Sequence, residues 1–353
     1  METKSNERLL AVLRKVAPGT PLRQSCDRII ASRHGALIVL SSRPEVLSLA
    51  QGGFEINSDF LSSRLYELAK MDGAIIVSSD YSRILWANVH LTPDVSITSS
   101  ETGTRSRTSE RVAKQTGAPV LCVSEEMGSI FLFLDGDKYS LDDLRLVMSR
   151  ATQALQALEK YTARLGNVLN NLTGLEFEGL AALEDVVLCV QRFGMVERIV
   201  REIVGFVVEL GVDGRLVEMQ LEEMTAGVKT EHDNLLKDYC RLKKNCSLAD
   251  MQTRLTALTN DELLELPVIA RSMGYAGTTE ALAQYVTPKG YRMLAQISRI
   301  SQPVIGKLVE RFGNLNNIVR ASRKQLEAVD GVGAARARIL QDGLRRLSET
   351  NVT

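Results

Sequence analysis

The sequence predicts an α/β N-terminal domain, with a central mixed sheet flanked by helices, followed by an all-α spacer and an all-α tail. Up to about residue 148, short apolar runs rich in β-branched residues alternate with helical stretches, which favours a sheet covered by helices. After that point apolar residues recur every three or four positions, and strand-like runs almost disappear. The last part reads as two helix–turn–helix units. We therefore expect three domains, at residues 1–148, 149–289 and 290–353.

The elements of the first region follow from apolar spacing and turn residues. A long polar segment precedes a helix that should end at Gly117, because Pro119 follows two residues later and glycine commonly ends helices. The apolar runs bounded by turn residues predict strands. We expect helices at 21–33 and 57–71, and strands at 35–41, 73–79, 83–89, 119–123 and 129–134.

The middle region reads as a helical spacer. A long helix is expected at 141–172, and helical patterns continue through 180–228 and 233–285. Its heptad-like stretches favour packing within the chain, and a helix for self-association is the alternative. The two units of the tail cover 300–319 and 322–347.

Composition points to a cytoplasmic protein without a membrane segment. No apolar run reaches the roughly 18 residues that a membrane span needs, and the charged N-terminus lacks the apolar core of a signal peptide. The five cysteines form no CxxC pair. Cys122 and Cys189 lie in apolar runs and are expected to be buried. His232, Cys240 and Cys246 are close in sequence, but their spacing matches no zinc pattern.

The charge distribution singles out the tail. The whole chain has 43 basic and 43 acidic residues, whereas residues 291–353 hold 11 Lys and Arg against five Asp and Glu. This basic segment contains VDGVGAARA (329–337), where two glycines permit a tight turn and small residues leave the amides of a helix N-terminus open to phosphate. The alternative is a plain helix–helix turn. The candidate DNA-binding residues are Gly331, Val332, Gly333, Ala334, Arg336 and Arg338.

Two motifs in the first region could carry chemistry. Asp72-Gly73-Ala74 stands before a strand and, taken alone, is an ordinary turn. The segment 103–108, GTRSRT, places hydroxyls and two arginines before a helix, which makes it either a polyphosphate cradle or a solvated loop.

These motifs carry a family resemblance. Residues 71–117 resemble the diadenylate cyclase domain of the DisA family, VDGVGAARA resembles a helix-hairpin-helix motif with residues 300–313 as its degenerate partner, and the order of the parts also matches. The resemblance implies that Asp72 holds a divalent metal, Mg²⁺ or Mn²⁺, and that Arg105 and Arg107 share the catalytic work. The implied ATP-binding residues are Asp72, Gly73, Ala74, Leu91, Thr104, Arg105, Ser106, Arg107, Thr108 and Ser124.

The resemblance also implies a reaction and an assembly. Two ATP molecules would become cyclic di-AMP and two pyrophosphates, with heads facing each other in a homo-oligomer, expected to be an octamer. The tail would bind branched DNA without reading its sequence, and that DNA would lower cyclase output.

One departure keeps alternatives open. The family pattern reads Gly-Thr-Arg-His-Arg, and this chain has Ser106 in place of the histidine. Serine can donate a hydrogen bond but cannot carry positive charge, so turnover is expected to be lower. A nucleotide-binding DNA-scanning protein with weak or no cyclase activity is the alternative. A nuclease would need clustered acidic ligands, and Asp72 with Asp80 is poorly placed for that. No general base is evident, since His90 is expected at a strand end.

Overall fold

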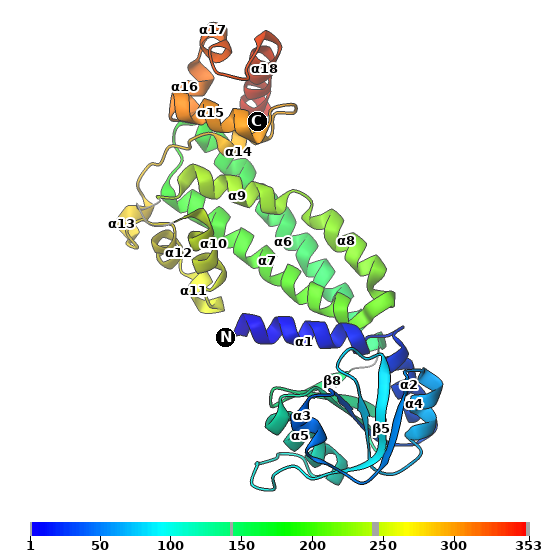
Figure 1. Cartoon of the computed structure of the whole chain (residues 1–353). Helices are drawn as coiled ribbons and strands as arrows, with labels where there is room; N and C mark the ends of the chain where they lie inside the picture. The colour runs from blue at the N-terminus through cyan, green and yellow to red at the C-terminus, as the bar shows by residue number, and fades with distance from the viewer. Residues whose placement is uncertain (1, 142–143, 242–246, 351–353) are drawn as a thin grey trace. The chain divides into compact units, whose positions relative to one another are not determined.

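The computed structural model describes residues 2–141, 144–241 and 247–350, so Cys246 lies outside the described part (Figure 1). The chain divides into two compact units. The first consists of Met1–Gln153 with Ile203–Met219, and the second of Ala154–Glu202 with Gln220–Thr353. The three sequence-based domain ranges, 1–148, 149–289 and 290–353, stay a prediction.

The first unit is built on one mixed sheet with strand order β2-β5-β4-β1-β6-β7-β8, and β3 also pairs with β5. β1 and β4 run parallel, while the other pairs are antiparallel, which confirms the expected mixed sheet. The strands are β1 Ala36–Leu40, β2 Ala50–Gln51, β3 Phe54–Asp59, β4 Ala74–Val77, β5 Arg83–Leu91, β6 Val120–Ser124, β7 Ser129–Leu134 and β8 Asp137–Leu141.

Helices cover both faces of this sheet, and β1 shows why. Its side chains alternate, so that Ile38 and Leu40 join one core with helices α2 and α4, while Leu37 and Val39 join another with α3 and α5. Figure 1 shows α2 and α4 together on one side of the sheet and α3 and α5 on the other. The helices are α1 Glu2–Val16, α2 Pro21–Ala31, α3 Pro44–Leu47, α4 Ser62–Leu68 and α5 Thr104–Thr116.

One expected helix begins later than its pattern indicates. The range predicted as helix, 57–71, opens in strand β3, and α4 starts at Ser62. β3 pairs antiparallel with β5 from Phe54 to Asp59. Its side chains are half-buried or exposed, so the strand lacks the apolar run by which the inner strands are recognised.

After β8 the described chain is helical, apart from a single bridge between Ala182 and Tyr285. The expected all-α spacer and tail are therefore confirmed. Among these described helices, none combines the length and the apolar character that a membrane crossing needs. The elements are α6 Leu144–Glu178, α7 Leu183–Leu210, the 3₁₀ helix η1 Gly211–Gly214, α8 Arg215–Thr225, α9 Val228–Tyr239, α10 Leu248–Thr256, α11 Asn260–Leu264, α12 Leu266–Ser272, α13 Thr279–Leu282, α14 Tyr291–Ala295, α15 Gln302–Phe312, α16 Leu315–Arg320, α17 Arg323–Glu327 and α18 Ala334–Thr350.

The tail helices α14–α18 enclose their own apolar core, which includes Leu294, Leu308 and Leu340. Two turns within it each contain a residue with a positive φ. Arg299, between α14 and α15, has a φ of 70°, and Gly331, between α17 and α18, has a φ of 87°. One turn therefore places an arginine in the left-handed region, where the other has glycine.

A buried carboxylate fixes the start of the tail. Asp238, at the end of α9, accepts backbone N–H bonds from Gly290 and Tyr291 at 2.7 Å and from Arg292 at 2.9 Å. The Arg292 side chain is also buried and pairs with Glu176 of α6. These contacts join α14 to the spacer helices within the second unit.

Candidate functional site

A cavity of about 970 Å³ opens on the α5 face of the sheet. Its floor is one row of residues across the four central strands: Leu37 of β1 is paired with Ala74 of β4 and with Cys122 of β6, and Ala74 is paired with Val89 of β5. The register of the sheet therefore brings together segments that are far apart in the sequence. Of the residues expected to bind nucleotide, Gly73, Ala74, Leu91, Thr104, Arg105, Ser106, Thr108 and Ser124 line this cavity.

Gly73 allows the chain to lie close to strand β5 just before β4 begins. Its φ is 91°, and a Cβ there would lie 2.9 Å from the carbonyl oxygen of Val89. A side chain is therefore excluded by both conformation and space. Asp72 precedes it, is exposed, and is not among the cavity-lining residues. The metal role of Asp72 stays a prediction.

The N-terminus of α5 forms one wall. Gly103 is the N-cap residue and caps the first backbone N–H groups of this 13-residue helix with no side-chain hydrogen bond, and Gly103, Thr104 and Arg105 line the cavity. Such a terminus favours anions.

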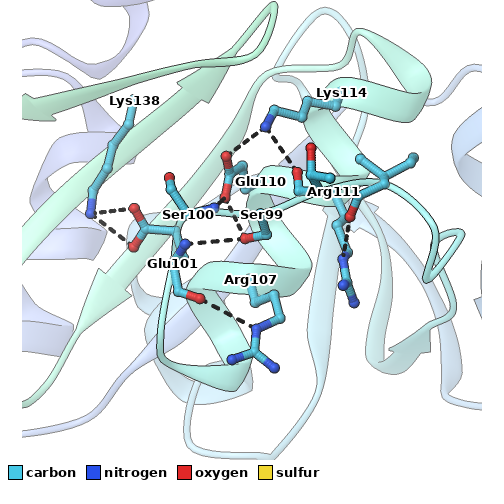
Figure 2. A network of polar contacts seen from close by, with 10 residues as sticks. Ser99, Ser100, Glu101, Arg107, Glu110, Arg111, Lys114 and Lys138 are labelled. Carbon is cyan, nitrogen blue, oxygen red and sulfur yellow. Dashed lines mark hydrogen bonds and ion pairs between the residues drawn. The ribbon is translucent and has the colours of Figure 1, made fainter.

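Arg107 has a different position from the one expected for a phosphate ligand. Its Nε donates to the carbonyl oxygen of Glu101 at 3.3 Å, and its Nη2 donates to that of Thr102 at 3.1 Å (Figure 2). It does not line the cavity. In this structure it holds the loop before α5, and its predicted phosphate contact stays a prediction.

A second set of contacts ties this loop down. The buried Glu110 accepts a hydrogen bond from Lys114 at 2.7 Å, one from the amide of Ser100 at 3.1 Å, and one from the hydroxyl of Ser99. Burial raises the pKa of Glu110, but hydrogen bonds from Lys114 and Ser99 outweigh it, and the net pKa is lowered. Figure 2 shows these contacts beside the Lys138–Glu101 ion pair.

Ser106 faces the sheet as well as the cavity. Its Oγ lies 3.6 Å from the Sγ of Cys122, which is buried as expected. Burial raises the pKa of the Cys122 thiol, so it is protonated at neutral pH. The side chain of Ser106 can therefore accept from or donate to a neutral thiol, but this pair supplies no charge to a bound phosphate.

The cavity has lining residues that the sequence did not indicate. Among them are Arg33 from the α2–β1 turn, Glu101 and Thr102 from the loop before α5, and Glu125, Glu126 and Met127 from the β6–β7 turn. The fold brings these turns together from separate parts of the sequence. A local signal existed for the β6–β7 turn, since Glu125 and Glu126 follow a buried strand directly.

The donor set suits a metal shared with a substrate better than a metal held by protein alone. No three His, Cys, Asp or Glu side chains come together as ligands anywhere in the described chain, and Cys246 lies outside it. Mg²⁺ and Mn²⁺ accept one or two carboxylates when substrate phosphates and water complete the shell. Asp72, which precedes a residue of a nucleotide-sized cavity, fits that arrangement.

The tail motif is exposed, with one exception. Gly331, Gly333, Ala334, Arg336 and Arg338 are exposed, whereas the side chain of Val332 is buried in the tail core. Arg336 Nη1 donates to the carbonyl oxygen of Gly331 at 2.6 Å. The Nε of Arg338 lies 3.8 Å from the Oδ2 of Asp342. A Cβ on Gly333 would meet nothing within 4 Å, so this surface is open.

Known proteins resemble this chain along almost its full length. Residues 23–138 match the family described as "DisA bacterial checkpoint controller nucleotide-binding", and residues 141–282 match "DisA bacterial checkpoint controller linker region". The DNA integrity scanning protein DisA of Frankia alni is 47% identical over 343 residues, which cover 97% of this chain and 96% of that protein. The same-named protein of Clostridium botulinum (strain Kyoto / Type A2) is 45% identical, covering 99% and 98%.

Among solved structures, a double mutant of DacA from Staphylococcus aureus matches 39% of this chain and 88% of its own chain, with 25% identity and a TM-score of 0.29. A TM-score this low carries no argument about fold or function.

Proposed function

Because the chain belongs to the DisA family of DNA integrity scanning proteins, we propose that its α/β unit is a diadenylate cyclase that joins two ATP molecules into cyclic di-AMP. The observation that carries this proposal is the cavity in which Gly73 and Ala74 meet the N-terminus of α5 and Arg105. This site has the size of a nucleotide pocket and positive groups on one wall.

The chemistry needs positioning more than covalent help from the protein. Each ribose 3′-hydroxyl attacks the α-phosphate of the other ATP, a new phosphodiester bond forms, and pyrophosphate leaves. The α5 amides and Arg105 hold the polyphosphate and stabilise negative charge that develops on it. Gly73 and Ala74 let the nucleotide lie against the floor, which Leu91 and Ser124 extend.

A divalent cation, Mg²⁺ or Mn²⁺, is proposed beside Asp72. When bound, it would withdraw charge from the phosphates and favour loss of the hydroxyl proton. Asp72 stands next to the floor glycine, which is where a carboxylate can share a cation with a bound triphosphate.

The reaction also demands two subunits. The product has two-fold symmetry and the described head of each chain contributes the cavity above, so two heads meet about a two-fold axis in the proposed assembly. The family resemblance makes an octamer the proposed form.

Incubation with ATP and either Mg²⁺ or Mn²⁺ tests the proposal. The expected result is cyclic di-AMP, lost in Asp72→Asn and kept in Asp213→Asn, which makes the same change at an exposed site of η1 outside the cavity. If the unaltered chain binds ATP and forms no product with either ion, the second candidate function holds: a nucleotide-binding scanning protein. Ser106 in place of histidine is the observation that favours that candidate.

The tail is proposed to bind duplex and branched DNA through phosphates. Gly333→Asp is a clean test because the new side chain has room, so lost affinity would come from charge rather than misfolding. We expect the DNA affinity of Gly333→Asp to be about tenfold or more below that of the unaltered chain. The DNA affinity of the unaltered chain should also decline as the salt concentration rises. Gly166→Asp in α6, which also has open space, is the control. Equal DNA affinities of Gly333→Asp and the unaltered chain would show that the tail motif does not bind the DNA.

DNA bound to the tail is further proposed to lower cyclase output. This coupling predicts that a DNA junction reduces the rate of the unaltered chain and leaves the rate of Gly333→Asp unchanged.

A further inference from the structure

The turn between α2 and β1 reaches the same cavity from a part of the sequence that no motif marks. Arg33 lines the cavity, and Gly35 stands two residues later, before the first residue of β1. The backbone of the turn is fixed, since the Arg33 amide donates to the Ile30 carbonyl at 2.9 Å and that of His34 donates to the Ile29 carbonyl at 3.0 Å. The Arg33 side chain takes no part in these bonds.

Gly35 lies directly beneath the guanidinium of Arg105. A Cβ on Gly35 would be 2.1 Å from Nη1 of Arg105 and 2.8 Å from its Cζ. The φ of Gly35 is not in the left-handed region, so alanine is conformationally allowed there and the conflict is one of space alone. The space that glycine leaves is therefore occupied by the side chain that is expected to hold phosphate.

The two arginines are also unpaired. Within residues 2–141, 144–241 and 247–350, neither the Arg33 nor the Arg105 side chain has a hydrogen bond or ion pair, although Glu125 and Glu126 line the same cavity. Arg33 moreover has a φ of 55°, a conformation in which glycine or asparagine is favoured. A long cationic side chain that lines the same cavity as a second cation suits a polyanionic ligand.

We propose that the α2–β1 turn completes the triphosphate-binding wall: Gly35 is a positioning residue that keeps the space for Arg105, and Arg33 supplies a second guanidinium. The inference rests on the proposed function, since it deepens the ATP site. It assigns the β- and γ-phosphates, rather than the base or ribose, to this wall.

The test is equilibrium binding of α,β-methylene-ATP, which cannot release pyrophosphate, compared with AMP. We expect Gly35→Ala and Arg33→Ala each to weaken the triphosphate about tenfold and AMP less than twofold, because each charge-assisted contact is lost only for the longer ligand. Arg33→Lys should recover part of the loss. Gly166→Ala and Arg28→Ala, which lie outside the cavity, should bind as the unaltered chain does.

A double-mutant cycle separates positioning from general damage. In an Arg105→Ala background the conflict with the guanidinium is gone and only the Val123 carbonyl oxygen, 3.1 Å from the Cβ, stays close, so adding Gly35→Ala should have little further effect on triphosphate binding. An equal loss in both backgrounds would overturn the positioning role, and unchanged binding in Arg33→Ala would overturn the second cation. Arg33→Gly relieves the left-handed conformation, so its thermal unfolding midpoint should hold or rise while triphosphate affinity falls. If Gly35→Ala fails to fold, the Arg33 variants still test whether the α2–β1 turn contributes to triphosphate binding.

This outcome is separable from that of the proposed function. If binding of the analogue depends on Gly35 and Arg33 as expected but no cyclic di-AMP forms, the inference stands and the proposed cyclase activity does not. If the unaltered chain makes cyclic di-AMP and both Gly35→Ala and Arg33→Ala bind the analogue normally, the proposed cyclase activity stands and the inference does not.

Discussion

At Ser106 the chain departs from the family pattern to which it is similar. Its hydroxyl contacts the neutral thiol of Cys122 at 3.6 Å, while the family pattern has a histidine that could add positive charge. Because Ser106 lines the cavity, a larger side chain has room to extend toward the substrate.

The first prediction is that Ser106→His raises kcat for cyclic di-AMP formation. The gain should reach up to about 10²-fold, the effect of a single donor placed on developing charge. Ser106→Ala should lower kcat only slightly, since the hydroxyl contacts a thiol. Steady-state kinetics at saturating ATP checks both variants, and an unaltered kcat in Ser106→His would show that the departure from the pattern has no catalytic cost.

Asp238 supports a prediction on pH. Burial raises its pKa to about 7, although backbone hydrogen bonds from Arg292, Tyr291 and Gly290 act in the other direction. An unfolded aspartate has a pKa of about 3.9. Between these two values the folded chain keeps a proton that the unfolded chain has lost. The contribution of Asp238 to the free energy of unfolding therefore falls as pH rises through this window, and levels off above it.

Urea unfolding at a series of pH values measures this contribution. The difference in unfolding free energy between the unaltered chain and Asp238→Asn should change by at most about 1.4 kcal/mol per pH unit below pH 7. Asp213→Asn, at an exposed position, should give a profile parallel to that of the unaltered chain. A parallel profile for Asp238→Asn as well would contradict the raised pKa.

At the scale of elements, the loop before α5 is the part that must be rigid for the cavity to keep its wall. Glu110 anchors it from within the helix through Ser99, Ser100 and Lys114 (Figure 2). Changing the carboxylate to an amide turns one acceptor into a donor, which then faces groups that are themselves donors.

Glu110→Gln is therefore expected to lower the free energy of unfolding by about 1–3 kcal/mol, the cost of an unsatisfied buried group, and to raise the KM for ATP more than it lowers kcat. Denaturant unfolding and initial rates measure the two effects. Glu45→Gln, at an exposed position of α3, is the matched control. Unchanged stability together with an unchanged KM would show that the loop does not depend on this anchor.

The sequence predicted the inner strands and missed the edges, for a physical reason. β1 and β4 are buried on both faces and read as apolar runs, whereas β8 pairs only with β7 and reads DKYSL. The end of α5 was predictable because Gly117 takes a left-handed conformation that glycine favours. Local patterns therefore predict elements whose environment is uniform, and edge strands lack that uniformity.

The candidate site divides in the same way. Gly73, Ala74 and the residues around Arg105 lie in contiguous motifs next to a strand or helix start, and the family resemblance that these motifs carry implied their role. Arg33 reaches the cavity only because β1 lies between β4 and β6, a topology that no local pattern contains. The position of Arg107 against the loop backbone could not be predicted either, because a side-chain direction depends on the folded loop.

At the scale of the whole molecule, the proposed reaction sets a requirement that one chain cannot meet. One cavity of about 970 Å³ lies in the described head, and two triphosphates must approach each other with their 3′-hydroxyls crossed. A single subunit can then bind ATP and still form no phosphodiester bond. Catalysis, unlike binding, must depend on the association of subunits.

The last prediction follows from that difference. When the protein is diluted below the concentration at which its subunits dissociate, the rate of cyclic di-AMP formation per chain should fall in proportion to the dilution, because paired heads then vary with the square of chain concentration. Binding of α,β-methylene-ATP should stay near one per chain over the same range, which serves as the control for folding. Analytical ultracentrifugation fixes the state of association at each concentration. A rate per chain that stays constant where the subunits are monomeric would contradict the face-to-face arrangement, because a lone head would then hold both nucleotides.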